Sequence, residues 1–188
     1  VPAAGDAARG RGALEAILSW TRLVKLHELA RGPVRLTLEP DEGERAAIAK
    51  RLGLVSLPSL VARLTVKPWL DGVEVTGRLD AVVEQVCGVS LDPFEQPLEA
   101  EIELRAVPAG SPHAAAPEGG ELELDPDAPD APDVLESDAI DVAEVVIEHL
   151  ALEIDPFPRK PEATFDYQAP ADETSPFAAL AKLKTPKA

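Results

Sequence analysis

An α+β fold is the class that this sequence predicts, with an antiparallel sheet of about four strands packed against two main helices and a disordered acidic insertion. Three observations indicate it. Four segments alternate apolar and polar residues, two segments place an apolar stripe at helical spacing behind a capping residue, and one long stretch has few large apolar side chains. With 188 residues, the chain is long enough for one domain with appendages.

The four predicted strands each have one apolar and one polar face, a pattern typical of antiparallel sheets with one wet side. They span residues 34–39, 60–67, 73–84 and 98–105. Gly77 interrupts the third, where we predict a bulge or kink. Asp71 and Gly72 predict a two-residue hairpin turn of type I′ between the second and third strands, because glycine accepts a positive φ.

The first predicted helix spans residues 41–52. Asp41 and Glu44 have the spacing of a capping box, in which each side chain binds the other residue's backbone N–H. Gly53 is expected to end this helix.

The second predicted helix spans residues 139–152 and begins near Ser137 or Asp138. Its apolar stripe faces the core, and Pro156 prevents its continuation. We expect both helices to cover the apolar face of the sheet.

The domain organisation follows from these elements and from composition. Segment 110–137 is rich in Pro, Ala and acid, so its burial cannot offset its ordering entropy, although Glu121 to Leu124 could form a short strand. We predict a disordered or mis-assigned N-terminal extension (1–19), the sheet-forming part of a single domain (20–109), the acidic insertion (110–137), a helix and extended segment that complete the domain (138–161), and a tail with a short amphipathic helix (162–188).

Charge is distributed unevenly along the chain. The net charge is −16, and residues 71–158 alone carry two basic and 23 acidic side chains. Such a field repels phosphate backbones, so direct RNA contact would have to use the basic N-terminal part. Trp20 and Trp69 lie near basic residues, but core or edge packing is the expected role of each.

Motifs for catalysis, cofactors and metals are missing from the sequence. It contains no GxSxG, GxxxxGK[ST] or GxGxxG pattern, so we predict no enzyme and no cofactor. Asp125, Asp127 and Glu136 match ligand positions of a calcium loop, but Pro129 and Asp130 stand where that loop requires an oxygen ligand and glycine. The single cysteine excludes an intramolecular disulfide and indicates a reducing compartment.

Three stretches together carry a resemblance to a known family. Residues 77–108 read as a strand, a turn containing Cys87, the motif Leu-Asp-Pro-Phe and a second strand; residues 140–161 add a helix with a Pro-rich continuation, and residues 175–184 a tail, SPFAALAKLK. This combination resembles the YceD family, described as large ribosomal RNA subunit accumulation proteins, over roughly residues 20–184. Many members have a C-x-x-C pair at the turn, where this chain has Cys87 and Ser90.

The resemblance implies a non-enzymatic role in the accumulation or processing of large-subunit ribosomal RNA and in ribosome assembly, in the cytoplasm. The implied partner is a preribosomal large-subunit particle or an assembly protein, with RNA contacted indirectly; no membrane and no small-molecule substrate is expected. We predict partner contact either through proteins or through a cationic group. The predicted contact residues are Arg45, Lys50, Arg51, Arg63, Lys67, Cys87, Asp92, Pro93, Phe94, Phe177, Leu180 and Leu183.

Two alternatives remain open from the residues alone. The acidic block also fits an acidic adaptor or nucleic-acid mimic that binds a basic partner surface, although it can serve solubility alone. In the tail, Phe177, Leu180 and Leu183 recur every three residues, so they could dock on a partner or on their own domain.

Overall fold

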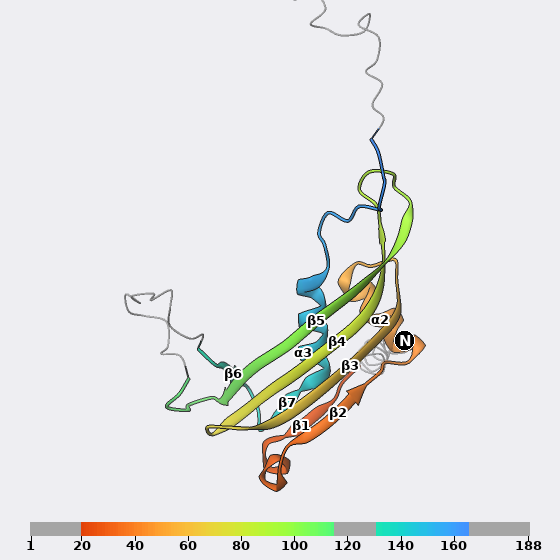
Figure 1. Cartoon of the computed structure of the whole chain (residues 1–188). Coiled ribbons are helices and arrows are strands. Elements are labelled where there is room, and N and C mark those ends of the chain that lie inside the picture. The colour runs from red at the N-terminus through yellow and green to blue at the C-terminus, as the bar shows by residue number, and fades with distance from the viewer. Residues whose placement is uncertain (1–19, 115–130, 166–188) are drawn as a thin grey trace, which may run out of the picture.

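The computed structural model describes residues 20–114 and 131–165, and it has an α+β fold (Figure 1). A mixed, mostly antiparallel sheet has five strands in the order β2-β3-β4-β5-β6, and a second sheet pairs β1 with β7. The strands are β1 (Leu23–Lys25), β2 (Val34–Leu38), β3 (Ser56–Trp69), β4 (Gly72–Val86), β5 (Pro93–Pro108), β6 (Asp133–Leu135) and β7 (Ala139–Asp141). The helices are the short 3-10 helix η1 (Leu26–Arg31), α2 (Glu42–Leu52) and α3 (Val142–Glu153).

The three long strands β3, β4 and β5 form a twisted antiparallel ribbon, with both helices behind it in Figure 1. Alternate side chains of these strands point to the helices and form the core with α2 and α3. Leu60, Leu79, Ile102 and Leu150 are among its largest fully buried side chains. Each such burial contributes about 1.5–3 kcal/mol to folding relative to an exposed side chain, so this face holds the fold together.

The insertion 110–137 is not free of structure at its end. Asp133–Leu135 forms β6, which pairs in parallel with Ala106–Pro108 of β5, so the last residues of the predicted insertion are ordered, and the sheet, predicted to be antiparallel, contains one parallel pair. The pairing partner lies far away in sequence, and a three-residue strand has no periodicity to detect. The short strand expected at 121–124 lies outside the described residues, as do the whole N-terminal extension and most of the tail.

Helix α2 confirms its predicted capping box. The Glu44 N–H donates to Asp41 Oδ1 at 2.8 Å, and the Asp41 N–H donates to Glu44 Oε2 at 2.7 Å. Gly53 follows the last helical residue in the left-handed conformation, as predicted.

Helix α3 begins at Val142, so the predicted start near Ser137 or Asp138 was wrong. Residues 139–141 instead form β7, because β1 offers them a backbone partner from the start of the chain. Asp141 caps the helix: its Oδ1 accepts hydrogen bonds from Ala143 N–H at 3.1 Å and from Arg22 N–H at 2.8 Å. The tertiary pairing therefore replaces the first turn that the local sequence favours.

The hairpin between β3 and β4 turns one residue earlier than predicted. Trp69 pairs with Gly72, which leaves Leu70 and Asp71 as the turn, and Leu70 takes the positive φ of 52°. Gly72 is required for space instead: a Cβ atom on it would lie 2.0 Å from Ala106 O. Gly77 likewise stays in register, and a Cβ there would lie 2.1 Å from Arg63 O, so the predicted bulge or kink is a close backbone approach.

Candidate functional site

The turn between β4 and β5, residues 87–92, lies at an end of the sheet that projects past the helices (Figure 1). We call it the Cys87 turn. The Cys87 N–H donates to Asp92 O at 2.9 Å, and the Leu91 N–H donates to Cys87 O at 3.0 Å. Leu91 has a positive φ of 63° and a side chain that is 74% exposed. A tight loop thus presents an apolar side chain to solvent.

The Cys87 thiol lies at the centre of this turn with no exposed surface. Its Sγ accepts backbone hydrogen bonds from Val89 and Ser90, both at 3.4 Å, and from Lys160 at 3.3 Å. The Ser90 side chain, followed by the Ser90 and Lys160 amides, lowers the pKa of the Cys87 thiol to about 6, while burial acts in the opposite direction. The sulfur therefore accepts three backbone hydrogen bonds, which hold the turn and Lys160 together.

The segment after α3 forms part of the same unit. The Gly88 N–H donates to Pro158 O at 2.8 Å, and Gln85 Nε2 donates to Asp155 O at 3.1 Å. The sulfur and two backbone contacts therefore tie residues 155–160 to the hairpin tip. The predicted contact residues did not include this segment; the inclusion of residues 140–161 in the family resemblance was the available signal.

The Leu-Asp-Pro-Phe motif leads from the Cys87 turn into β5. Asp92 and Pro93 are exposed, and Phe94 is half-buried. Phe94 lines a shallow hollow with Phe157 and Arg159 from the segment after α3. The structure thus brings Cys87, Asp92, Pro93 and Phe94 together at one end of the molecule.

No metal-binding group of three or more His, Cys, Asp or Glu side chains occurs among residues 20–114 and 131–165. Ser90 holds the position that would need a second sulfur, and its hydroxyl is not a soft ligand. Within those ranges the turn is best described as a hydrogen-bonded structure around one buried sulfur.

The five predicted cationic contacts do not share one surface. Arg45, Lys50 and Arg51 belong to α2, on the helical side of the sheet. Arg63 and Lys67 alternate with buried residues of β3, so they point to the opposite, outward face.

Four of these five cations already have a partner, either a carboxylate that forms an ion pair or a carbonyl oxygen that accepts a hydrogen bond. Arg45 donates to Pro40 O at 2.9 Å, and Arg51 forms an ion pair with Glu144. Arg63 and Lys67 pair with acids of β4: Arg63 with Asp80 at 2.8 Å, and Lys67 with Glu74. Lys50 has no such partner within the described part of the chain. The positive charge on these elements is largely compensated.

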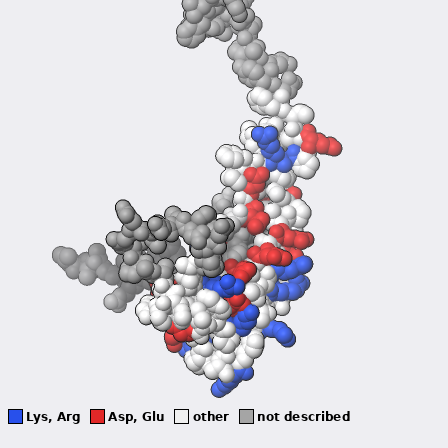
Figure 2. Space-filling model, turned by 60° about the vertical axis from the view of Figure 1, so that its left-hand side comes forward, with Lys and Arg blue, Asp and Glu red and all other residues white. Residues whose placement is uncertain are grey.

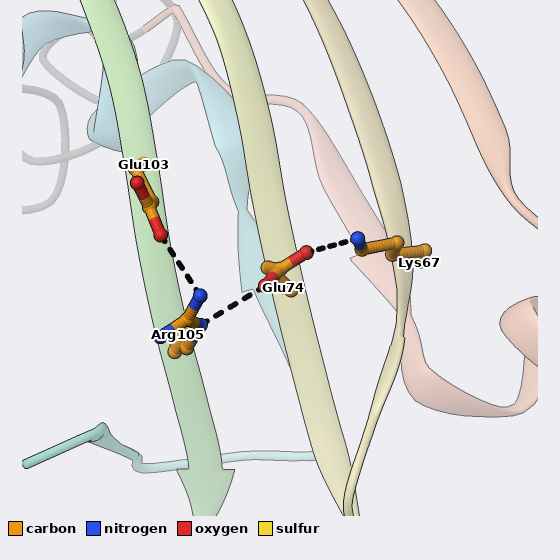
Figure 3. A network of polar contacts seen from close by, with 4 residues as sticks. All are labelled: Lys67, Glu74, Glu103 and Arg105. Atoms are coloured by element: carbon orange, nitrogen blue, oxygen red, sulfur yellow. Dashed lines mark hydrogen bonds and ion pairs between the residues drawn. The ribbon is translucent and has the colours of Figure 1, made fainter.

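Glu74 is the centre of the polar network on the outward face (Figure 3). This carboxylate is 5% exposed and lies between Lys67 and Arg105, whose Nε is 2.9 Å from Glu74 Oε1. Hydrogen bonds from Lys67 and then Arg105 lower the pKa of Glu74. Arg105 also binds Glu103 at 2.9 Å and lies over the Trp69 ring. Trp69 therefore packs within the hairpin network.

Three further predicted contacts, Phe177, Leu180 and Leu183, lie outside the described residues. Within those residues, no helix combines the length and apolarity needed to cross a membrane.

The comparisons with known proteins give one match. No curated protein and no solved structure matches this chain. The family model for "Large ribosomal RNA subunit accumulation protein YceD" matches residues 75–184, which include most of β4, the Cys87 turn, β5 and α3. Since the match spans more than half of the sequence and contains the turn on which the resemblance rested, this chain belongs to the YceD family.

Proposed function

We propose that this protein is a non-enzymatic cytoplasmic factor in the accumulation or processing of large-subunit ribosomal RNA and in ribosome assembly. Family membership is the observation that carries the proposal, since the family's name describes accumulation of that RNA. The buried Cys87 thiol supports the non-enzymatic part, because a sulfur with no exposed surface is not presented to a substrate.

The factor acts mainly through protein contacts. The five cations predicted to contact a partner divide between two faces, and Arg51, Arg63 and Lys67 are already paired with carboxylates. An RNA backbone bound at these residues would have to displace their acidic partners, which weakens binding.

Depletion of the protein in its native cell tests the role in RNA accumulation. Large-subunit and small-subunit RNA and their precursor ends are quantified after depletion, with re-expression of the unmodified chain as control. We expect a selective fall of the large-subunit RNA, reversed by re-expression. An unchanged ratio after verified depletion would reject the proposal.

A variant with five substitutions tests how the protein contacts its partner. It replaces the five predicted cations by Gln, which removes the positive charge and keeps a polar side chain at Arg45, Lys50, Arg51, Arg63 and Lys67. Association with preribosomal particles, measured by co-sedimentation, should persist if contact is protein-mediated. Its loss in a variant that still folds, shown by circular dichroism, would assign direct contact to these residues.

An acidic adaptor that binds a basic partner surface is the second candidate. The many acidic side chains of residues 71–158 favour this role. A deletion within the insertion distinguishes an insertion that binds the partner from one that is only a spacer. Because β6 begins at Asp133, the deletion should be confined to residues 115–130. Loss of the partner supports an adaptor role for the insertion, whereas unchanged function supports a spacer.

A further inference from the structure

We propose that the free edge of β5 binds an extended basic segment of a partner protein by β-strand addition. The inference deepens the proposed function, because it describes how a protein partner is held, and it assigns the partner's chemistry: basic residues at alternate positions, separated by apolar ones.

No strand among the described residues covers the edge of β5 along most of its length, although the segment after α3 lies beside residues 94–97. Residues 93–105 pair with β4 on one side, whereas β6 pairs only with Ala106–Pro108. Within the described residues, no strand pairs with the other side of residues 93–105. A strand edge of this length presents unpaired N–H and C=O groups that another strand can bind.

Pro97 indicates which backbone groups face this edge. Proline lacks an N–H and fits an edge strand when its nitrogen points away from the neighbouring strand. In a strand, the backbone groups of every second residue point the same way. We therefore expect the N–H and C=O groups of Glu99, Glu101 and Glu103 to lie on the free edge.

The outward side chains of β5 form a row of carboxylates. Glu95, Glu99 and Glu101 are exposed, and among the described residues none of them has an ion-pair partner. The nearest cation across the strands, Arg78, lies opposite Glu101 and is already bound to Asp80 at 3.1 Å. Figure 2 shows acidic and basic side chains close together on one face of the molecule, and none of the ion pairs among the described residues includes Glu95, Glu99 or Glu101. This row attracts Lys or Arg side chains of an added strand.

The opposite face of the same strand is apolar. Leu98, Ala100 and Leu104 point toward the helices but are only partly buried, although they pack on the core. An added strand would cover them with its own inward side chains. The two faces of β5 therefore select a segment that alternates basic and apolar residues.

Charge argues against three other occupants of this edge. A second copy of this chain, paired edge to edge, would place two rows of glutamates side by side. The insertion residues 115–130 contain six acidic residues and no Lys or Arg, so they are repelled as well. A single RNA strand carries the wrong charge for this row.

Binding of a synthetic peptide to the full-length chain tests the inference. The probe is a peptide of about ten residues that alternates Lys with Val or Thr, as strand addition requires. Its affinity is measured by fluorescence anisotropy, and hydrogen exchange of the protein reports the position. We expect saturable binding, with added amide protection confined to β5.

Two variants and one peptide control separate strand addition from general attraction. Glu99→Lys with Glu101→Lys should weaken binding at least about tenfold, since like charges then face each other. Glu136→Lys with Glu153→Lys makes the same change in net charge on exposed positions elsewhere and should leave affinity within about twofold. A peptide with N-methyl groups at alternate residues keeps its charge but loses edge hydrogen bonds, and should also bind at least about tenfold more weakly.

Three results would overturn the inference: no binding by the unmodified chain, equal weakening in both variant pairs, or equal affinity for the N-methylated peptide. Preferential binding of a single-stranded RNA of the same length to β5 would also overturn it. The depletion experiment remains independent. If the RNA ratio falls but the peptide does not bind, only the edge inference fails; if the peptide binds but the ratio is unchanged, the proposed function fails.

Discussion

The two faces of the β3–β4–β5 ribbon have opposite chemistry on the same backbone. The helix-side face consists of buried Val, Leu, Ile and Ala side chains, whereas the outward face carries ion pairs such as Arg63–Asp80. The first face stabilises the fold because its apolar surface is removed from water. Exposed ion pairs on the second contribute about 0–1 kcal/mol each, so that face adds much less to stability.

The two long edges of the sheet differ in the same way. The β2 edge is five residues long, whereas the free part of the β5 edge is more than twice that length and carries a row of carboxylates. Short edge strands resist the addition of another strand, and charged edges restrict what can be added. The molecule therefore limits one edge by length and the other by charge.

The largest expected effect is on the buried face. Leu79→Ala removes a side chain with 0% exposure from the central strand and should lower the free energy of unfolding by about 2–5 kcal/mol, because it leaves a cavity. Urea unfolding of both proteins measures the difference. The exposed Leu152, changed to Ala, is the control and should alter stability by less than about 0.5 kcal/mol. Equal effects of the two changes would contradict the assignment of the core.

The next effect tests how closely β3 and β4 approach. Gly77→Val places a side chain where Arg63 O already lies 2.1 Å from the Cβ position, and we expect a loss of about 1–3 kcal/mol. Val has a higher strand propensity than Gly, so propensity alone predicts the opposite sign. A thermal melt that shows Gly77→Val to be as stable as the unmodified chain would mean that the strands separate without cost.

A smaller effect is expected at Glu74, the buried acid of the outward face. Glu74→Gln should cost about 1 kcal/mol at neutral pH, because Lys67 and Arg105 lose their shared carboxylate. The pKa of Glu74 is lowered in the folded state, so its contribution is present above the ordinary Glu pKa and is lost as the pH falls through the lowered value. In urea unfolding between pH 3 and 7, the free energy of unfolding should fall less steeply with decreasing pH in the variant than in the unmodified chain. Parallel curves for the two proteins would contradict this assignment.

The last expected effect appears only in a window of pH, at the Cys87 turn. The pKa of the Cys87 thiol is lowered from 9.0 to about 6 in the folded state. Its contribution to the free energy of unfolding is therefore fully present above pH 9 and is lost as the pH falls through 6. The stability difference between the unmodified chain and Cys87→Ala should therefore grow as the pH rises from 6 to 9.

Ser90→Ala sharpens the same prediction. The Ser90 side chain is the main cause of the lowered pKa, so its removal should raise the pKa at which the thiolate absorbance appears. A thiolate titration that is identical in both proteins would show that the backbone amides alone set the thiol pKa.

Much of the candidate site followed from sequence, and part of it did not. Cys87 and Asp92 in the turn lie close to Pro93 and Phe94 at the start of β5, as neighbours in a hairpin must. Their contact with Lys160, 73 residues further on, needed the path of α3 across the sheet. The cationic residues were grouped by sequence proximity, but strand alternation sends Arg63 to the face opposite α2.

The sequence by itself determined the long strands, the two helices and the capping box of α2, because these depend on side-chain periodicity and on contacts a few residues apart. Tertiary structure alone decided the strands β6 and β7, the later start of α3 and the need for glycine at position 72. Three-residue strands have no stability of their own, and they form where a distant backbone supplies the missing hydrogen bonds. The crowding at Gly72 likewise comes from Ala106 on another strand, a neighbour that no local pattern reveals.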